Sequence, residues 1–276
     1  MNYSVIIPTY NRAHLLTRAL DSVFGQTILP IQVIVVDDGS TDQTADLVKK
    51  RYPQVTLLSE ENRGVSASRN RGFQKVITDW VALLDSDDEW LPEKMELQLA
   101  ELGRTGLLVC HSEEIWIRNG VRVNAKHKHQ KKRGDIFYDC LRLCAMSPSS
   151  VVLHRDIWHE FAGFDEGFIV CEDYDLWLRI CAKYLVALID TPQVKKYGGH
   201  DDQLSRQYFG MDKYRVLAMQ KMLNADLSTE QSELLNDVLQ YKLQILYQGA
   251  LKHQNAELLG FCEQRKHLLK AVINKR

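Results

Sequence analysis

The sequence predicts an α/β fold in which a mostly parallel sheet is flanked by helices and followed by a helical C-terminal extension. Over roughly the first hundred residues, short β-rich runs alternate with amphipathic stretches, which is the pattern of βαβ units. From Tyr208 onward, apolar residues recur at three- and four-residue spacing with no strand-like run, as in packed helices.

The alternation places strands at residues 4–7, 33–36, 55–58 and 81–84, and helices at 13–26, 41–51, 65–76 and 92–102. Ser40 or Thr41 is the expected N-cap of the second helix, because its hydroxyl can accept a backbone hydrogen bond. Beyond residue 107 we expect a hairpin with its turn at Asn119-Gly120, a strand at 150–153 and a helix at 173–183. This organisation predicts one domain at residues 1–205 and a helical subdomain at 206–276.

Composition excludes several classes of protein. The 276 residues include 35 Lys plus Arg and 36 Asp plus Glu, so no overall field attracts nucleic acid. The six cysteines form no CxxC pair and are interpreted as reduced core residues of a cytosolic protein. No signal peptide precedes the first strand. The sequence therefore predicts a cytoplasmic location, with any membrane contact peripheral and on the inner face, and it contains no pattern that sets an oligomeric state.

Three strand ends carry the polar residues from which chemistry is expected, because ligands of open parallel sheets bind at the carboxyl ends of the strands. Thr9 follows the first strand, Asp38 follows the second, and Asp85 and Asp87 follow a strongly apolar run. Clustered carboxylates repel one another, so the last group predicts a hard divalent cation. The alternative for this group is a solvated acidic turn that caps the next helix; a calcium loop lacks its sixth-position glycine.

Taken together, these positions resemble the family 2 glycosyltransferases of the GT-A fold, which have a Rossmann-like sheet. The motifs that carry the resemblance occur in the family's order: Pro8-Thr9-Tyr10-Asn11, Asp37-Asp38-Gly39-Ser40, Gly64 followed by Arg69-Asn70, Asp85-Ser86-Asp87, and Glu172-Asp173. The chain has no Gln-x-x-Arg-Trp motif and no apolar run that could span a membrane, so it departs from the processive branch of the family.

The resemblance implies roles for the donor half of the site. Thr9 and Asp38 are expected to touch a uracil base, Arg69 to help bind the nucleotide, and Asp85 to reach the ribose. Asp87 is expected to bind Mg²⁺ or Mn²⁺ bridging two phosphates, and oxygen ligands suit both cations. The sequence does not discriminate between the two metals.

The resemblance also implies a catalytic base, Asp173, with Glu172 beside it among the substrate-binding residues. Without the family motif, both would be interpreted as helix N-terminal acids favoured by the dipole. His200 resembles a histidine that approaches the diphosphate in many relatives, although a single loop histidine is usually solvated.

These expectations define an inverting glycosyltransferase that moves a sugar from a nucleotide-sugar, specifically a UDP-sugar, to the hydroxyl of a glycan or lipid-linked acceptor. The implied process is synthesis of a bacterial surface polysaccharide or lipopolysaccharide. One alternative is a nucleotidyltransferase, but residues 9–12 lack the glycine-rich loop expected after the first strand. The other is a non-catalytic nucleotide- or glycan-binding relative, but Asp85, Asp87 and Asp173 are all present.

The basic run at residues 126–133 has two interpretations of equal weight. It can meet the phosphates of a lipid-linked acceptor or an anionic membrane, or it can be a solvated loop.

Overall fold

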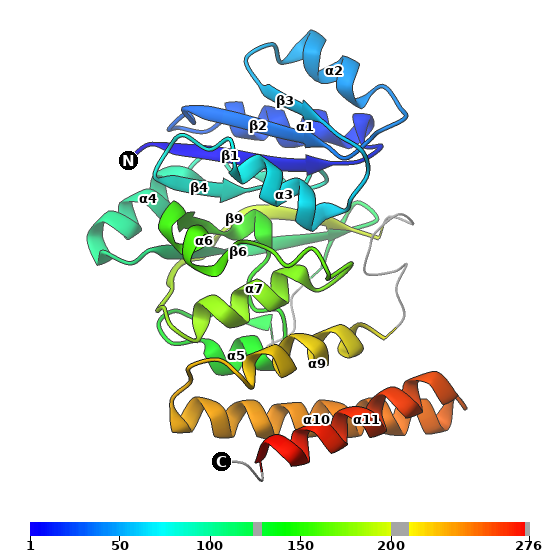
Figure 1. The fold of residues 1–276 in the computed structure, drawn as a ribbon. Helices are drawn as coiled ribbons and strands as arrows, with labels where there is room; N and C mark the ends of the chain where they lie inside the picture. Colours follow the sequence, from blue (N-terminus) through cyan, green and yellow to red (C-terminus); the bar gives the residue numbers. More distant parts are fainter. Residues whose placement is uncertain (124–128, 200–209, 274–276) are drawn as a thin grey trace.

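The computed structural model describes residues 1–123, 129–199 and 210–273. A mixed sheet forms its centre, with strands in the order β3-β2-β1-β4-β8-β6-β9-β5 and β7 paired to β6 (Figure 1). The strands are β1 (Tyr3–Thr9), β2 (Gln32–Asp37), β3 (Thr56–Ser59), β4 (Trp80–Leu83), β5 (Glu89–Trp90), β6 (Val109–Arg118), β7 (Val121–Val123), β8 (Val152–His154) and β9 (Ala187–Gly198).

Strands β1, β2 and β4 are parallel to one another and buried on both faces, whereas β3, at the edge of the sheet, is partly exposed. In β1, Val5 and Ile7 point to one core while Ile6 points to the other, because successive side chains of a strand alternate between faces. A two-sided core favours apolar residues at successive positions, which is why the centres of these strands are apolar runs.

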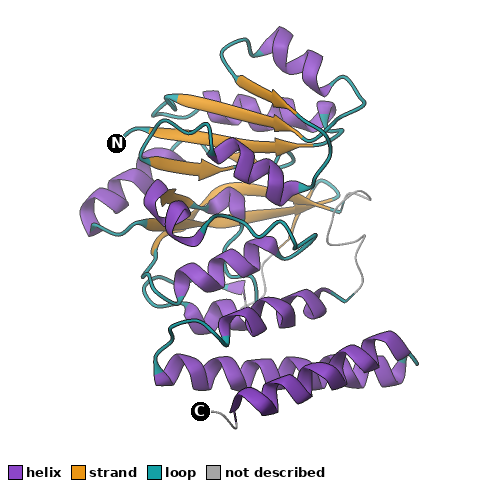
Figure 2. Ribbon diagram, in the orientation of Figure 1, coloured by secondary structure: helices purple, strands orange, loops and turns teal. Residues whose placement is uncertain are grey.

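Helices cover both faces of the sheet, as Figure 2 shows. One core contains residues of α1, α2 and α4, and the other contains residues of α3, α5, α6 and α7. The helices of this part are α1 (Ala13–Phe24), α2 (Thr44–Arg51), α3 (Val65–Phe73), α4 (Lys94–Thr105), α5 (Phe137–Arg142), the 3₁₀ turn η2 (Pro148–Ser150), α6 (Arg155–Phe161) and α7 (Glu172–Cys181). The predicted α/β class with flanking helices is confirmed.

The predicted cap of the second helix is wrong. The helix begins at Thr44, and its N-terminal backbone is bonded by Asp42, whose Oδ1 accepts the Thr44 N–H at 2.9 Å. Ser40 instead accepts the Asn11 N–H at 2.8 Å, and the Thr41 N–H donates to Asn11 Oδ1 at 2.7 Å. Both candidate caps therefore join the loops that follow β1 and β2.

The pattern of the sequence did not predict β9, which runs beside β6 through nine paired positions. β9 contains Pro192 and adjacent lysines, which disfavour a strand assignment. The pairing tolerates them because the register shifts twice between Ser112 and Glu114 of β6. Parallel pairing with a partner distant in the sequence leaves no local signal.

The C-terminal helices α9 (Met211–Met222), α10 (Thr229–Lys252) and α11 (Ala256–Ile273) lie beyond α5 and α7 in Figure 1. Val216, Met219 and Leu239 belong to the same buried core as residues of α5 and α7. The helical extension is therefore present, and it shares its core with the sheet-bearing part. The predicted boundary at residue 205 lies outside the described residues and stays a prediction.

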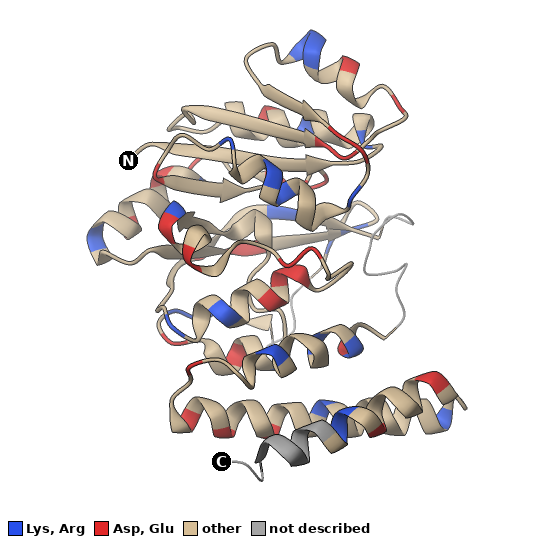
Figure 3. Ribbon diagram, viewed as in Figure 1, with Lys and Arg blue, Asp and Glu red and all other residues tan. Residues whose placement is uncertain are grey.

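Charged residues of both signs are spread through the described chain, as Figure 3 shows. Within the described residues, none of the helices combines the length and the apolar character needed to cross a bilayer.

Candidate active site

The carboxyl ends of β1, β2 and β4 meet at one edge of the sheet. β1 pairs in parallel with both other strands, and the register places Thr9 opposite Asp37. Thr9 Oγ1 is buried and has no hydrogen-bond partner among the described residues. An unpaired buried hydroxyl costs about 1–3 kcal/mol, so a ligand that bonds to Thr9 removes this cost.

Asp38 anchors the loop that leads into α3. Its Oδ1 accepts the Arg63 N–H at 2.8 Å and its Oδ2 accepts the Gly64 N–H at 2.9 Å. Gly39 follows at φ +79°, in the left-handed region that a side chain disfavours. A hollow of about 250 Å³ opens beside Asp38, with Asn70 in its wall. The residues lining this hollow do not include the acids that follow β4.

Arg69 joins the donor half of the predicted site to Glu172, the residue that precedes the predicted base. Its Nη2 donates to Asp85 at 2.8 Å and its Nη1 donates to Glu172 at 2.6 Å. Burial alone would raise the pKa of Asp85, but the charge of Arg69 and of two further cations lowers it below the usual value. Burial raises the pKa of Glu172 despite the attraction of Arg69. The guanidinium therefore positions two acids that are 87 residues apart in the chain (172 minus 85).

Gly72 allows α3 to bring Arg69 to this place. A Cβ at residue 72 would lie 2.6 Å from the Cγ2 of Ile6, which is closer than side-chain atoms pack. The glycine therefore permits α3 to lie directly on β1.

Asp87 and Asp88 are adjacent in sequence and differ in surroundings. Asp87 Oδ2 accepts from Arg12 Nη1 at 2.6 Å, and its side chain is 16% exposed. Asp88 is 1% exposed and accepts from the Ser149 hydroxyl at 2.6 Å and from the Tyr197 N–H at 3.1 Å. Asp88 therefore ties β4, η2 and β9 together, while Asp87 lies at the surface of the site.

Lys196 of β9 brings a cation to the acidic cluster. Its Nζ lies 3.8 Å from Asp88 Oδ2. Burial alone would lower the pKa of Lys196, but four surrounding acids raise it, so the ammonium stays protonated. Burial raises the pKa of Asp88 to about 8. The surrounding acids are Asp88, Glu114, Asp85 and Asp87.

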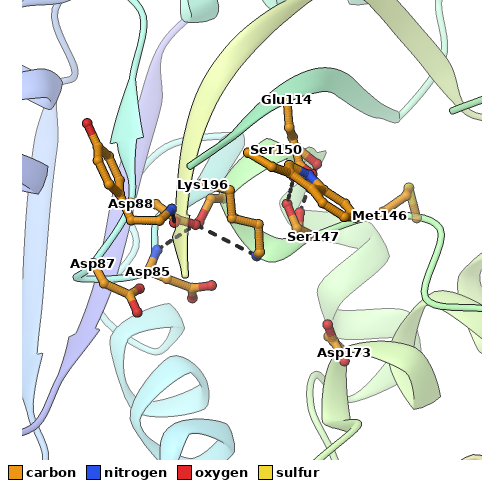
Figure 4. Close-up of polar contacts among 12 residues, drawn as sticks. Asp85, Asp87, Asp88, Glu114, Met146, Ser147, Ser150, Asp173 and Lys196 are labelled. Atoms are coloured by element: carbon orange, nitrogen blue, oxygen red, sulfur yellow. Dashed lines mark hydrogen bonds and ion pairs between the residues drawn. The ribbon is translucent and has the colours of Figure 1, made fainter. Parts of the chain in front are cut away.

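Asp173 lies in the first turn of α7, where both of its carboxylate oxygens accept hydrogen bonds. Oδ1 accepts the Tyr174 N–H at 2.7 Å, and Oδ2 accepts from the Cys144 thiol at 3.2 Å. The orientation of the carboxylate is thereby fixed. Figure 4 shows Asp85 and Asp87 toward one side of the group of side chains drawn and Asp173 toward the other.

The donor atoms at this place are compatible with a hard cation. Asp85 and Asp87 offer carboxylate oxygens, which Mg²⁺ and Mn²⁺ prefer. Among the residues with described positions, no three His, Cys, Asp or Glu side chains gather as a complete metal site. A cation here would complete its coordination with oxygens of a bound diphosphate.

Two further predictions fall wholly or partly on residues outside the described ranges. His200 lies outside the described residues, and so do residues 126–128 of the basic run. The described end of that run is paired with acids of the same chain: Lys131 with Glu114 at 3.2 Å, Lys132 with Asp139 at 2.8 Å and Arg133 with Asp190 at 3.1 Å.

Comparison with known proteins identifies the class. The family model described as glycosyl transferase family 2 matches residues 4–158. Residues 1–349 of S. aureus TarS in complex with UDP-GlcNAc share the fold, with a TM-score of 0.79 and 21% identity over 99% of this chain and 81% of that chain. The fold is that of a GT-A glycosyltransferase. The chain belongs to glycosyltransferase family 2.

Two curated relatives illustrate the range of lengths. The Escherichia coli UDP-Glc:alpha-D-GlcNAc-diphosphoundecaprenol beta-1,3-glucosyltransferase WfgD is 28% identical over 221 residues, which are 79% of this chain and 83% of that protein. A glycosyltransferase of Rickettsia felis is 29% identical over 195 residues, which are 68% of this chain and 31% of that protein. The chain thus spans about a third of the length of the Rickettsia relative.

Sequence reasoning missed three residues of the candidate site. Arg12 directly follows the motif Pro8-Thr9-Tyr10-Asn11, so its position was a usable signal. Lys196 lies in β9, which the sequence pattern did not predict, so nothing in the sequence indicated that its side chain lies near the acids that follow β4. Cys144 gave no signal, because a cysteine in an apolar segment is most often part of a core.

Proposed function

We propose that this glycosyltransferase moves a sugar from a UDP-sugar to a hydroxyl acceptor with inversion at the anomeric carbon. The observation that carries the proposal is the link from Asp85 through Arg69 to Glu172, which brings the acids that follow β4 and the start of α7 to one guanidinium. The names of WfgD and of the TarS complex, which include UDP-sugars, support the choice of nucleotide.

The donor nucleotide binds along the carboxyl edge of the sheet. The unpaired hydroxyl of Thr9 bonds to the base, and Asp38 contacts the base from the adjacent strand end. Asp85 bonds to the ribose, and Arg69 fixes its orientation. His200, which lies outside the described residues, is assigned to the diphosphate on the family resemblance alone.

The transfer is a single displacement. The acceptor oxygen attacks the anomeric carbon as the bond from that carbon to the diphosphate oxygen breaks. Asp173 takes the proton of the acceptor hydroxyl, and the fixed direction of its carboxylate keeps it on the acceptor side. Attack opposite the leaving group inverts the configuration.

The leaving nucleoside diphosphate carries negative charge, which must be neutralised on the donor side of the site. Asp87 would hold Mg²⁺ or Mn²⁺ when the donor is present, and such a cation would supply Lewis-acid stabilisation of the departing phosphates. Arg12, which pairs with Asp87 at 2.6 Å, also contacts the diphosphate. Lys196 adds a fixed positive charge beside the same acids.

We place the reaction in assembly of a bacterial surface polysaccharide or lipopolysaccharide, at the cytoplasmic side of the membrane. This assignment is supported by the lipid-linked acceptor in the name of WfgD.

The test is slow hydrolysis of UDP-, GDP- and TDP-sugars, each with Mg²⁺, with Mn²⁺ and with EDTA. The expected result is nucleotide release from a UDP-sugar that stops when EDTA removes the metal. Release from GDP- or TDP-sugars alone would contradict the role of Thr9 and Asp38, and release unaffected by EDTA would contradict the role of Asp87.

A further inference from the structure

Two arginines, one directly before α1 and one within it, converge on Asp87. Arg12 donates from Nη1 to Asp87 Oδ2 at 2.6 Å, and the two side chains are 14% and 16% exposed. Arg18 donates from Nη2 to the main-chain carbonyl of Asp87, and its guanidinium lies 3.7 Å from the ring centroid of Tyr197. The side chain and the main chain of Asp87 therefore each accept a hydrogen bond from a guanidinium group.

The other two aspartates that follow β4 also have cationic partners. Arg69 donates to Asp85 at 2.8 Å, and Lys196 Nζ lies 3.8 Å from Asp88 Oδ2. Figure 4 shows Asp85, Asp87 and Asp88 grouped at the end of β4 with Lys196 beside them. Repulsion within a carboxylate cluster favours a divalent cation, and these ion pairs reduce that repulsion. The chain therefore neutralises by itself part of the charge that would attract a metal.

Arg12 and a divalent cation compete for one carboxylate. Asp87 is the proposed metal ligand, and its Oδ2 already accepts a charge-assisted hydrogen bond from Arg12. Bonds of this kind are roughly twice as strong as those between neutral groups. A guanidinium so close to Asp87 also repels a second cation, and the partial burial of both side chains limits screening of that repulsion by water. We therefore expect Asp87 to bind a metal only weakly when no nucleotide is added.

A diphosphate changes this competition because it offers oxygen ligands to both cations. A guanidinium binds phosphate oxygens through paired hydrogen bonds. Mg²⁺ and Mn²⁺ accept phosphate oxygens together with one or two carboxylates. The negative charge of the diphosphate also reduces the repulsion between the guanidinium and the metal.

We propose that Arg12 makes metal binding depend on the diphosphate: it competes with the cation for Asp87, and the diphosphate ends that competition by accepting hydrogen bonds from the guanidinium. The inference rests on the proposed transferase function, because it concerns how the donor and its metal bind to that same site. Arg12 is thus a residue that couples two ligands. Since such coupling is reciprocal, the metal also strengthens binding of the nucleotide.

The first test titrates the full chain with MnCl₂ in the absence of nucleotide and follows the electron paramagnetic resonance signal of free Mn²⁺. Arg12→Gln should bind Mn²⁺ about tenfold more tightly than the parent, since the carboxylate no longer shares a charge-assisted hydrogen bond. Arg12→Lys should bind Mn²⁺ as the parent does, because an ammonium group retains the competing charge.

The second test measures UDP binding to the same proteins by calorimetry in EDTA. Arg12→Gln should bind UDP about tenfold more weakly than the parent, because the diphosphate loses a guanidinium partner. Arg12→Lys should recover most of the affinity. The two expected effects of Arg12→Gln have opposite signs. An ion pair that only held the loop before α1 in place would, when lost, weaken the binding of both ligands.

A matched control removes an arginine far from the acids. Arg104 is exposed and pairs with Glu101 of the same helix at 2.7 Å, and its neighbour Gly103 lies beside Met1, at the opposite end of β1 from Thr9. Arg104→Gln should change neither affinity. Mn²⁺ binding that is unchanged or weaker in Arg12→Gln, including no measurable binding by either protein, would overturn the proposal.

Hydrolysis of the UDP-sugar by the parent protein separates the two proposals. Absence of metal-dependent hydrolysis would contradict the proposed function. Metal-dependent hydrolysis by the parent, combined with equal Mn²⁺ affinity of the parent and Arg12→Gln, would contradict the role of Arg12 alone.

Discussion

At the scale of single residues, neighbours decide what each acid of the site can do. Asp87 and Asp88 are chemically identical and adjacent, yet Asp88 is buried under bonds from Ser149 and Tyr197 while Asp87 borders the site. The sequence predicts the acidic cluster because the acids follow an apolar strand. The difference in burial between Asp87 and Asp88 depends on η2 and β9, which are distant from them in the chain.

Replacing Asp173 by Asn should lower kcat about 10²–10⁴-fold, the usual contribution of a general base, and leave the affinity for the UDP-sugar unchanged. The amide has nearly the same shape but cannot take the acceptor proton. Steady-state transfer and donor titration measure the two quantities. Asp46→Asn, an exposed acid in the first turn of α2, is the matched control. Equal activity of both variants would show that Asp173 is only a favourable helix-terminal charge.

Cys144 is expected to position the base through its thiol. Cys144→Ala should lower kcat several-fold at unchanged donor KM, because the Asp173 carboxylate loses the donor that fixes its direction. Cys144→Ser should recover most of the rate, since a hydroxyl donates a stronger hydrogen bond. A serine variant as slow as the alanine variant would indicate that Cys144 acts through packing.

At the scale of elements, α4 begins with a lysine that the fold buries completely. Lys94 is fully buried, its Nζ lies 4.1 Å from the Trp90 ring centroid, and no acid pairs with it among the described residues. Burial lowers the pKa of Lys94 from 10.5 to about 7. Between these pH values the unfolded chain binds the proton that the folded chain has released, so the free energy of unfolding rises with pH.

The contribution of Lys94 to the free energy of unfolding should therefore rise by about 1.4 kcal/mol per pH unit above pH 7. Lys94→Met should be more stable than the parent at pH 6 to 7, and this advantage should shrink as the pH rises from 7 to 9. Urea unfolding at each pH measures it. The control, Lys252→Met, removes an exposed lysine and should show no such trend; a constant advantage for Lys94→Met would contradict the buried neutral amine.

At the scale of the whole molecule, the helical extension and the catalytic part share one core. All five tryptophans lie at or before residue 177, so tryptophan fluorescence reports on the catalytic part. Leu239→Ala, in α10, should lower the free energy of unfolding seen by fluorescence by about 2–5 kcal/mol. Its exposed neighbour Gln240→Ala should have little effect. A fluorescence transition unmoved by Leu239→Ala would show that the extension unfolds separately.

The sequence by itself determined the parallel half of the sheet, its helices, the family motifs and the acids at the strand ends. These features depend on local order: strand polarity, apolar runs and the residue that directly follows each strand. The helix starting at Glu172 was predicted for the same reason. Only the tertiary structure decided that β9 lies beside β6, that Lys196 reaches the acids of β4, that Arg69 joins Asp85 to Glu172, and that Cys144 bonds to Asp173. Each of these contacts pairs segments that are far apart in the chain. Such a contact imposes no periodicity on either segment, so it can be identified only in the folded structure.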